Sequence, residues 1–176
     1  MLNVKVTRMT NSDVDEVFRL EEIIHPGHHW SKQSFYNELA NNLAEYYCVK
    51  DEISEKIFGY IGFWRIIDEA HITTLGVHPD YRRKRIAQIL LIQMLENSYK
   101  NMIKYITLEV RESNISAISL YEKFLFESIG MRKNYYQDNG ENALIMFTQN
   151  IWYDKFKNNF EQLKLQINGS VSLYVE

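Results

Sequence analysis

The most regular hydrophobic pattern in the chain predicts a strand, a turn and a helix in succession. The β-branched, apolar run Thr73–Val77 ends just before Pro79, which cannot donate a ladder hydrogen bond, so a buried strand should stop there. After a polar turn, apolar residues recur at helical spacing and predict a helix from near Arg82 to about Tyr99. The residues that define this periodicity are Ile86, Ile89, Leu90, Met94 and Leu95.

Strands and helices are also predicted on the N-terminal side of this unit. Alternation over residues 2–7 predicts a short strand, and Asp13 with Glu16 forms a capping box for a helix that follows. That helix should bury Val14, Val17, Phe18 and Leu20. Ser31 is placed to cap a second helix with Phe35 and Leu39 on one side. Three antiparallel strands are then expected over residues 46–50, 57–67 and 71–77.

The second half of the chain completes an α/β pattern. Tyr105–Arg111 reads as a strand, and a strand–helix–strand order with short links implies that it lies parallel to residues 71–77. A helix capped by Asn114 follows, and residues 127–136 and 143–147 are expected to pair antiparallel. We therefore expect an α/β fold with a mixed, mostly antiparallel sheet, a central parallel strand pair and flanking helices.

Residues 148–176 are predicted to form an extension beyond a domain that spans residues 1–147. Trp152, Phe156, Phe160 and Leu163 recur near helical spacing and predict an amphipathic helix. Alternation around Asn168-Gly169 predicts a hairpin that pairs Leu165 with Val171 and Leu163 with Leu173. Such a unit could cover the domain or contact a partner.

Composition narrows the class of protein. A chain of 176 residues with 45% hydrophobic content suits a single full-sized core. A net charge of −3 does not indicate a protein that binds nucleic acid directly. The single cysteine, Cys48, allows no internal disulfide, fits a reducing compartment, and lies in an apolar strand as expected of a structural thiol. No apolar run is long enough for a membrane span, and the N-terminus does not read as a secretory signal.

Four consecutive cations, Arg82 to Arg85, are predicted to lie in the first turn of the central helix. Free backbone N–H groups and the positive end of the helix dipole lie there too, so the unit suits a phosphate or pyrophosphate. A solvated basic run is the alternative for the cations taken alone. The histidines of His25–His29 lack a second cluster of ligands, so no metal site is predicted. Trp30, which follows them, suits either a substrate-facing wall or simple packing.

The loop Arg82-Arg83-Lys84-Arg85-Ile86-Ala87 resembles the coenzyme A loop of the GNAT acetyltransferases. The signature of that loop is Arg or Gln, two residues, Gly, one residue, then Gly or Ala. Further segments follow in the order found in the ribosomal-protein-alanine N-acetyltransferases of this family, especially the cyanobacterial and plastid members. These segments are Leu108–Arg111, Ser113-Asn114, Ala117–Tyr121, and Arg132–Tyr136 with Gly140–Ala143. The resemblance covers roughly residues 2–147.

The resemblance implies an acetyl-CoA-dependent N-acetyltransferase that acts on a protein N-terminal α-amine, such as that of a ribosomal protein. It implies Glu109 as the proton acceptor, working through water, and Tyr121 as the proton donor to the thiolate. A solvent-facing glutamate and a core tyrosine are the alternatives at these positions. Acetyl-CoA is expected to contact Leu75, Gly76, Val77, Arg82, Arg83, Lys84, Arg85, Ile86, Ala87, Gln88 and Asn114. Trp30, Tyr135 and Tyr136 are candidates for lining the acceptor slot, with ordinary packing as the alternative.

Arg85 and Leu125 stand where the family usually has glycine. We expect Arg85 to hold a helical backbone angle with its side chain beside the anion, and Leu125 to distort the helix cap or end the helix differently. These departures keep open a second class, an acyl-CoA-binding module without turnover. A GNAT enzyme acting on lysine or a small amine, and a non-enzymatic protein that works through its tail, are further alternatives. The expected location is the cytoplasm or the plastid stroma.

Overall fold

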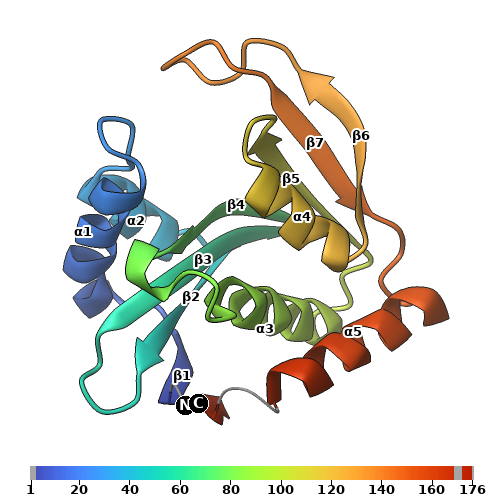
Figure 1. The fold of residues 1–176 in the computed structure, drawn as a ribbon, viewed down its shortest axis with the longest axis horizontal. Coiled ribbons are helices and arrows are strands. Elements are labelled where there is room, and N and C mark those ends of the chain that lie inside the picture. Colours follow the sequence, from blue (N-terminus) through green and yellow to red (C-terminus); the bar gives the residue numbers. More distant parts are fainter. Residues whose placement is uncertain (1–2, 169–171, 176) are drawn as a thin grey trace.

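A mixed sheet runs through the centre of the computed structural model, which describes residues 3–168 and 172–175 (Figure 1). Its eight strands lie in the order β6-β7-β5-β4-β3-β2-β1-β8. The strands are β1 (Asn3–Arg8), β2 (Ala44–Asp51), β3 (Ile57–Ile66), β4 (Glu69–Val77), β5 (Tyr105–Arg111), β6 (Phe126–Arg132), β7 (Ala143–Thr148) and β8 (Ser172–Val175). The helices are α1 (Val14–Ile24), α2 (Lys32–Leu39), α3 (Ile86–Lys100), α4 (Ile115–Lys123) and α5 (Asp154–Asn168), with short 3₁₀ turns η1 (Asn11–Asp13) and η2 (Pro79–Tyr81).

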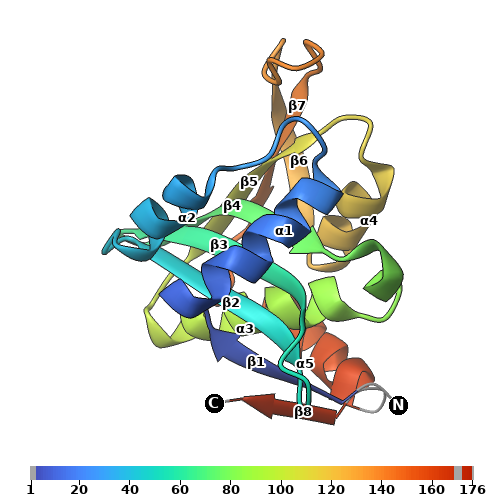
Figure 2. The same ribbon diagram turned by 90° about the vertical axis from the view of Figure 1, so that its left-hand side faces the viewer.

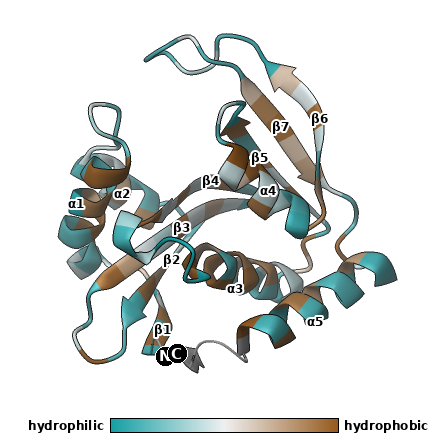
Figure 3. Ribbon diagram, viewed as in Figure 1, coloured by the Kyte–Doolittle hydropathy of each residue, from teal (hydrophilic) through white to brown (hydrophobic). Residues whose placement is uncertain are grey.

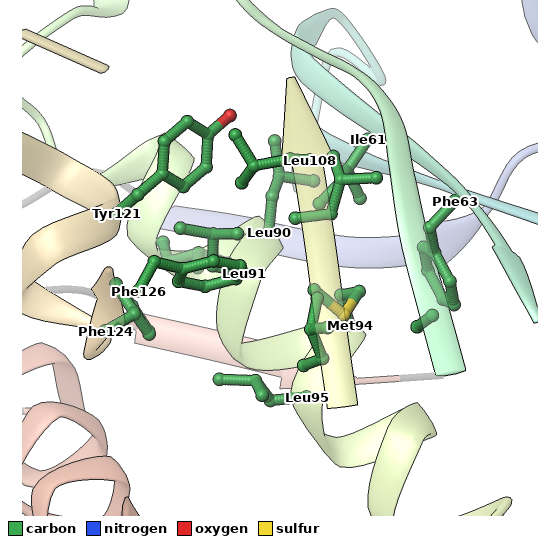
Figure 4. Packing of buried hydrophobic residues seen from close by; sticks show 14 of the residues in the cluster. Ile61, Phe63, Leu90, Leu91, Met94, Leu95, Leu108, Tyr121, Phe124 and Phe126 are labelled. Atoms are coloured by element: carbon green, nitrogen blue, oxygen red, sulfur yellow. The ribbon is translucent and has the colours of Figure 1, made fainter. Parts of the chain in front are cut away.

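Helices cover both faces of the sheet, as Figure 2 shows from the side. Helices α1 and α2 pack on one face over a cluster that includes Tyr46, Cys48 and Tyr60. Helices α3, α4 and α5 lie on the other face over the larger cluster, part of which Figure 4 shows. Alternation along each strand divides its side chains between these two cores. Helix α3 is the most evenly hydrophobic helix in Figure 3 because it lies between the sheet and α5.

The predicted fold class is confirmed. The sheet is mostly antiparallel, and β4 and β5 form the expected central parallel pair, from Glu69 beside Tyr105 to Ile72 beside Leu108. A second parallel pair, β1 with β8, was not predicted. Burial of Cys48 raises the pKa of its thiol, as expected of a structural cysteine. No helix within the described ranges is long and apolar enough to cross a membrane.

Two local predictions about the first helices had different outcomes. The capping box lies one turn earlier than predicted, because the Thr10 amide donates to the Asp13 carboxylate at 2.9 Å. Glu16 instead accepts a hydrogen bond from the Ile57 amide at 2.8 Å, joining α1 to β3. The Ser31 cap of α2 is confirmed, since its hydroxyl accepts from the Ser34 amide at 3.0 Å.

The tail contains the predicted amphipathic helix but not the predicted hairpin. Leu163 and Leu165, assigned to a hairpin strand, lie inside α5, while Gly169 and Val171 lie outside the described residues. Residues 172–175 pair with β1, from Asn3 beside Ser172 to Val6 beside Val175. The helical spacing from Phe156 through Phe160 continues to Ile167, and it prevails over the short alternation that suggested a strand.

Candidate functional site

The parallel strands β4 and β5 separate at the centre of the molecule. They pair over four residues, and then a register shift in the β3–β4 ladder leaves Thr73 as an extra residue between Ile72 and Thr74. Such a bulge bends a strand. Beyond it, the edge of Leu75–Val77 that faces β5 has no strand partner within the described chain. Its main-chain groups can therefore pair with an extended, peptide-like ligand, and contact with acetyl-CoA along this edge stays a prediction.

The four cations lie in a turn before α3, not in its first turn as predicted. Helix α3 begins at Ile86, and the amide of Ile89 makes the first helical bond, to the Arg85 carbonyl at 3.0 Å. The amides of Ile86, Ala87 and Gln88 therefore lie at the positive end of the helix without helical partners. This arrangement, next to exposed cations, suits a phosphate or pyrophosphate.

The expected helical backbone angle of Arg85 is wrong. Its backbone is left-handed, with φ +66° and ψ 7°, and Arg83 in the same turn also has positive φ. Position 85 keeps the conformation that glycine adopts freely, at a cost of about 1–2 kcal/mol for a residue with a Cβ. Nη1 of the Arg85 guanidinium donates a hydrogen bond to the main-chain oxygen of Gln166 in α5.

Glu109 is held by two basic side chains instead of pointing to solvent. Its side chain is 11% exposed. Oε2 lies 2.6 Å from Nε2 of His71, and Oε1 accepts from Nε of Arg132 at 3.1 Å. Sequence reasoning missed His71. His71 and Glu109 lie on the same face of adjacent strands, but only the β4–β5 register brings them together.

Residues around His71 extend this cluster toward α2. The Trp64 ring lies edge-on to His71 at 6.0 Å, and its Nε1 donates to Glu38 at 2.5 Å. The Tyr46 hydroxyl lies 3.3 Å from the hydroxyl of Thr73, the bulge residue. The face of the sheet under α1 and α2 thus places a linked set of acidic and aromatic groups beside the strand split.

Tyr121 lies on the opposite face of the sheet from Glu109. It is 6% exposed and packs against Phe126 at 5.5 Å. Figure 4 shows its hydroxyl pointing away from Phe124 and Phe126, next to Leu108 of β5. Burial, with a smaller contribution from Tyr136, raises the pKa of the Tyr121 hydroxyl. The group therefore keeps its proton at neutral pH, as a proton donor must.

Both ends of α4, which carries Tyr121, are well defined. The Asn114 side chain accepts from the Ala117 amide at 3.2 Å, so the predicted cap is confirmed. Leu125 neither distorts the cap nor ends the helix differently. It takes the left-handed conformation itself, with φ +58°, in the position that glycine usually fills after a helix.

The loop between β6 and β7 contains both candidate acceptor tyrosines, because β6 ends at Arg132 and not at Tyr136 as predicted. The Arg111 guanidinium stacks 3.8 Å from the Tyr136 ring centre and binds Asp138 at 2.8 Å. Burial raises the pKa of Tyr136 to about 12. Tyr135 is 44% exposed.

Trp30 lies in the loop between α1 and α2 and is partly buried against Phe35, at 5.4 Å. The neighbouring His25 has its pKa lowered by burial and then by the charges of Arg111 and Arg82. This loop therefore lies within electrostatic reach of both the β5 end and the cationic turn. No group of three or more metal-ligating side chains is placed to hold a metal ion in the part of the chain that the structure describes.

Comparison with known proteins gives consistent matches. The model of the acetyltransferase (GNAT) family matches residues 14–126. A Bacillus subtilis protein, provisionally named a ribosomal protein bS18-alanine N-acetyltransferase, is 38% identical over 142 residues, which cover 81% of this chain and 93% of that protein. The crystal structure of the ribosomal-protein-S18-alanine N-acetyltransferase from Escherichia coli superimposes with a TM-score of 0.75 at 26% identity, covering 83% and 93% of the two chains. Arabidopsis thaliana NAA60 in complex with acetyl-CoA shares the fold, with a TM-score of 0.74 at 18% identity over 84% and 98% of the chains.

Proposed function

This chain belongs to the acetyltransferase (GNAT) family, and from that premise we propose that it acetylates the N-terminal α-amine of a protein. Enzymes of this family use acetyl-CoA as the acetyl donor, and the chain is an N-acetyltransferase. The favoured acceptor is the N-terminal alanine of a ribosomal protein, the acceptor for which the relatives in Bacillus subtilis and Escherichia coli are named. Such an acceptor would place the enzyme with ribosomes, in a bacterial cytoplasm or a plastid stroma.

The observation that carries this proposal is the position of Glu109 at the split between β4 and β5. A thioester held along the free edge of Leu75–Val77 would lie in the split, with its pyrophosphate at the amides of Ile86, Ala87 and Gln88. Glu109 approaches that split from one face of the sheet, and Tyr121 approaches it from the other. A base and an acid on opposite sides of the same gap suit attack on the thioester from one side and departure of the thiolate on the other.

The proposed reaction is a direct transfer. The ammonium of the acceptor loses a proton to Glu109 through a water molecule, and the neutral amine attacks the thioester carbonyl carbon. A C–N bond forms, which leaves the nitrogen with one proton in excess, and the C–S bond breaks as Tyr121 gives its proton to the departing thiolate. The excess proton on nitrogen then leaves and reprotonates Tyr121, which gives the neutral amide and the thiol. Amides of Leu75–Val77 polarise the carbonyl oxygen. His71 and Arg132 hold the Glu109 carboxylate in place on both of its oxygens.

The surroundings of Glu109 suit a cationic acceptor. Glu38, joined to His71 through Trp64, adds negative charge on the face where the amine would enter. The loop with Trp30 and the loop with Tyr135 and Tyr136 are the proposed walls of the acceptor slot. The pKa of Asp138 is lowered mainly by its hydrogen bond with Arg111 and to a small extent by the charge of His28, so the two loops lie within electrostatic reach of one another. A protein N-terminus, which is flexible and narrow, can enter between two such loops.

An acetylation assay with peptides tests the acceptor. Peptides with N-terminal Ala, Ser, Met or Gly are compared with the same peptides carrying a blocked N-terminus and one internal lysine. We expect product only on free α-amines, with Ala preferred, and mass spectrometry locates the added acetyl group. Acetylation of the blocked peptide would instead indicate a lysine acetyltransferase. A thermal shift with acetyl-CoA, together with no turnover on any amine, would indicate a binding module.

A further inference from the structure

Helix α5 lies beside two of the three positions near the proposed reaction centre where a residue other than glycine adopts a left-handed backbone, Arg85 and Leu125; Arg83 is the third. Arg85 precedes α3 with φ +66°, and Leu125 follows α4 with φ +58°. Glycine adopts such angles at no steric cost, whereas a residue with a Cβ needs support from its surroundings. In this chain, the Arg85 side chain binds α5, and Leu125 lines a hollow together with Phe156 of α5.

Helix α5 is firmly attached to the domain. Phe156 and Phe160 are buried in the larger core, and the Phe160 ring lies 5.6 Å from that of Tyr99 in α3. Lys164 forms an ion pair with Glu96 of α3 at 3.0 Å. Because α5 is fixed against α3, side chains that bind α5 are held in a defined position.

The C-terminal end of α5 holds the cationic turn. Gln166 lies in the last turn of α5, at the negative end of the helix dipole. The Arg85 guanidinium donates to the carbonyl oxygen of Gln166. The hydrogen bond places a cation at the negative end of the α5 dipole, where it is stabilised. It also fixes the side chain of Arg85, whose backbone is strained. The tether therefore stabilises the left-handed turn that leads into the free amides of α3.

The middle of α5 holds the end of α4. Nδ2 of Asn159 donates to the carbonyl oxygen of Lys123, the last residue of α4, at 3.0 Å. Leu125 packs against the core cluster that contains Phe156, and the two residues line a common hollow. The C-terminal end of α4, the helix that carries Tyr121, is thus hydrogen-bonded to α5.

We propose that α5 is a positioning element of the acetyl-CoA site and that Arg85 is a positioning residue. Arg85 holds the cationic turn in its binding conformation through α5, and it does not touch the phosphates. The inference rests on the proposed assignment of this turn to the pyrophosphate. It goes beyond that assignment because it gives a role to α5, which lies outside the matched family region.

Two substitutions of Arg85 in the full-length chain test the inference. Arg85→Ala removes the tether and keeps the left-handed strain, whereas Arg85→Gly removes both. We expect Arg85→Ala to weaken acetyl-CoA binding about tenfold, the factor that corresponds to a left-handed penalty on one residue, and Arg85→Gly to stay within about twofold of the parent. In kinetics, Arg85→Ala should raise KM for acetyl-CoA and leave kcat near the parent value. Calorimetric titration at two salt concentrations gives the affinities.

Other outcomes would overturn the inference. If Arg85→Ala and Arg85→Gly weaken acetyl-CoA binding equally, and the affinity of both variants depends less on salt than that of the parent, the guanidinium contacts the phosphates directly. If neither substitution weakens acetyl-CoA binding, the hydrogen bond between Arg85 and Gln166 has no role in that binding. A tighter complex of Arg85→Gly than of the parent would mean that Arg85 obstructs the loop.

Control variants separate this inference from the loop assignment on which it rests. Arg83→Ala and Arg83→Gly measure the left-handed cost in the same turn, because Arg83 shares the positive φ but, among the described residues, forms no hydrogen bond or ion pair with α5. Ala87→Glu places a carboxylate among the free amides of α3. Unchanged acetyl-CoA affinity in that variant would refute the loop assignment itself. Unfolding temperatures confirm that each variant is folded.

Discussion

Replacing Glu109 by Gln should separate catalysis from stability more clearly than any other single change in this chain. The substitution keeps the size of the side chain and removes the charge that accepts the proton. General-base catalysis typically contributes about 10²–10⁴-fold. We therefore expect the acetylation rate to fall by at least about a hundredfold, which corresponds to roughly 3 kcal/mol of transition-state stabilisation.

The structural cost of the same change should be small. The ion pair with Arg132 is weak because the arginine side chain is 55% exposed, and such pairs contribute about 0–1 kcal/mol. The hydrogen bond with His71 has a charged acceptor and contributes about 1.5–3 kcal/mol, and a glutamine amide oxygen can replace a large part of it. The loss in free energy of unfolding should thus stay below about 2 kcal/mol. Acetyl-CoA affinity should hardly change, because the carboxylate acts on the acceptor.

Initial rates with a preferred peptide, measured across pH at saturating acetyl-CoA, give the comparison. Urea unfolding and calorimetric titration give stability and cofactor affinity for the same preparations. Glu69→Gln is the matched control, since Glu69 is an exposed carboxylate two residues before His71 on the same strand. A Glu109→Gln rate within threefold of the parent at every pH would remove Glu109 from the mechanism. A hundredfold loss in the Glu69 control would show that the assay responds to general charge.

Three further predictions follow from burial and pKa. Tyr121→Phe keeps the ring packing and removes only the hydroxyl, so turnover should fall at least about tenfold with unchanged unfolding temperature, and a parent-like rate would leave Tyr121 as core packing. Phe160→Ala removes a side chain that is 3% exposed between α5 and α3, and urea unfolding should show a loss of about 3–5 kcal/mol; a loss under about 1 kcal/mol would show that α5 is not part of the core. Hydrogen bonds from Ser113 are the main cause that lowers the pKa of Glu141 from 4.5 to about 2. The carboxylate therefore stabilises the fold above pH 4.5 and loses this effect as the pH falls toward 2, so the unfolding temperatures of the parent and Glu141→Gln should converge over that range and diverge above it.

The sequence determined the elements whose signals are local. Alternation set the bounds of β5 at Tyr105–Arg111, and the strand–helix–strand order predicted its parallel pairing with β4. Ser31 and Asn114 were found as helix caps because a cap depends on residues only three positions apart. The resemblance likewise depended on short segments in a fixed order, and the family match confirms it.

Tertiary structure decided what depends on segments far apart in the chain. His71 and Glu109 meet only because of the register between β4 and β5, which no local pattern encodes. The sequence placed the start of α3 at Arg82, four residues too early. The four cations are compatible with either a turn or the first turn of a helix, and the hydrophobic periodicity begins only at Ile86. The backbone angle of Arg85 was mispredicted because the support for a left-handed residue lies 81 positions away, at Gln166. The sequence shows that position 85 lacks the expected glycine. Only the tertiary structure shows that the Arg85 side chain binds α5.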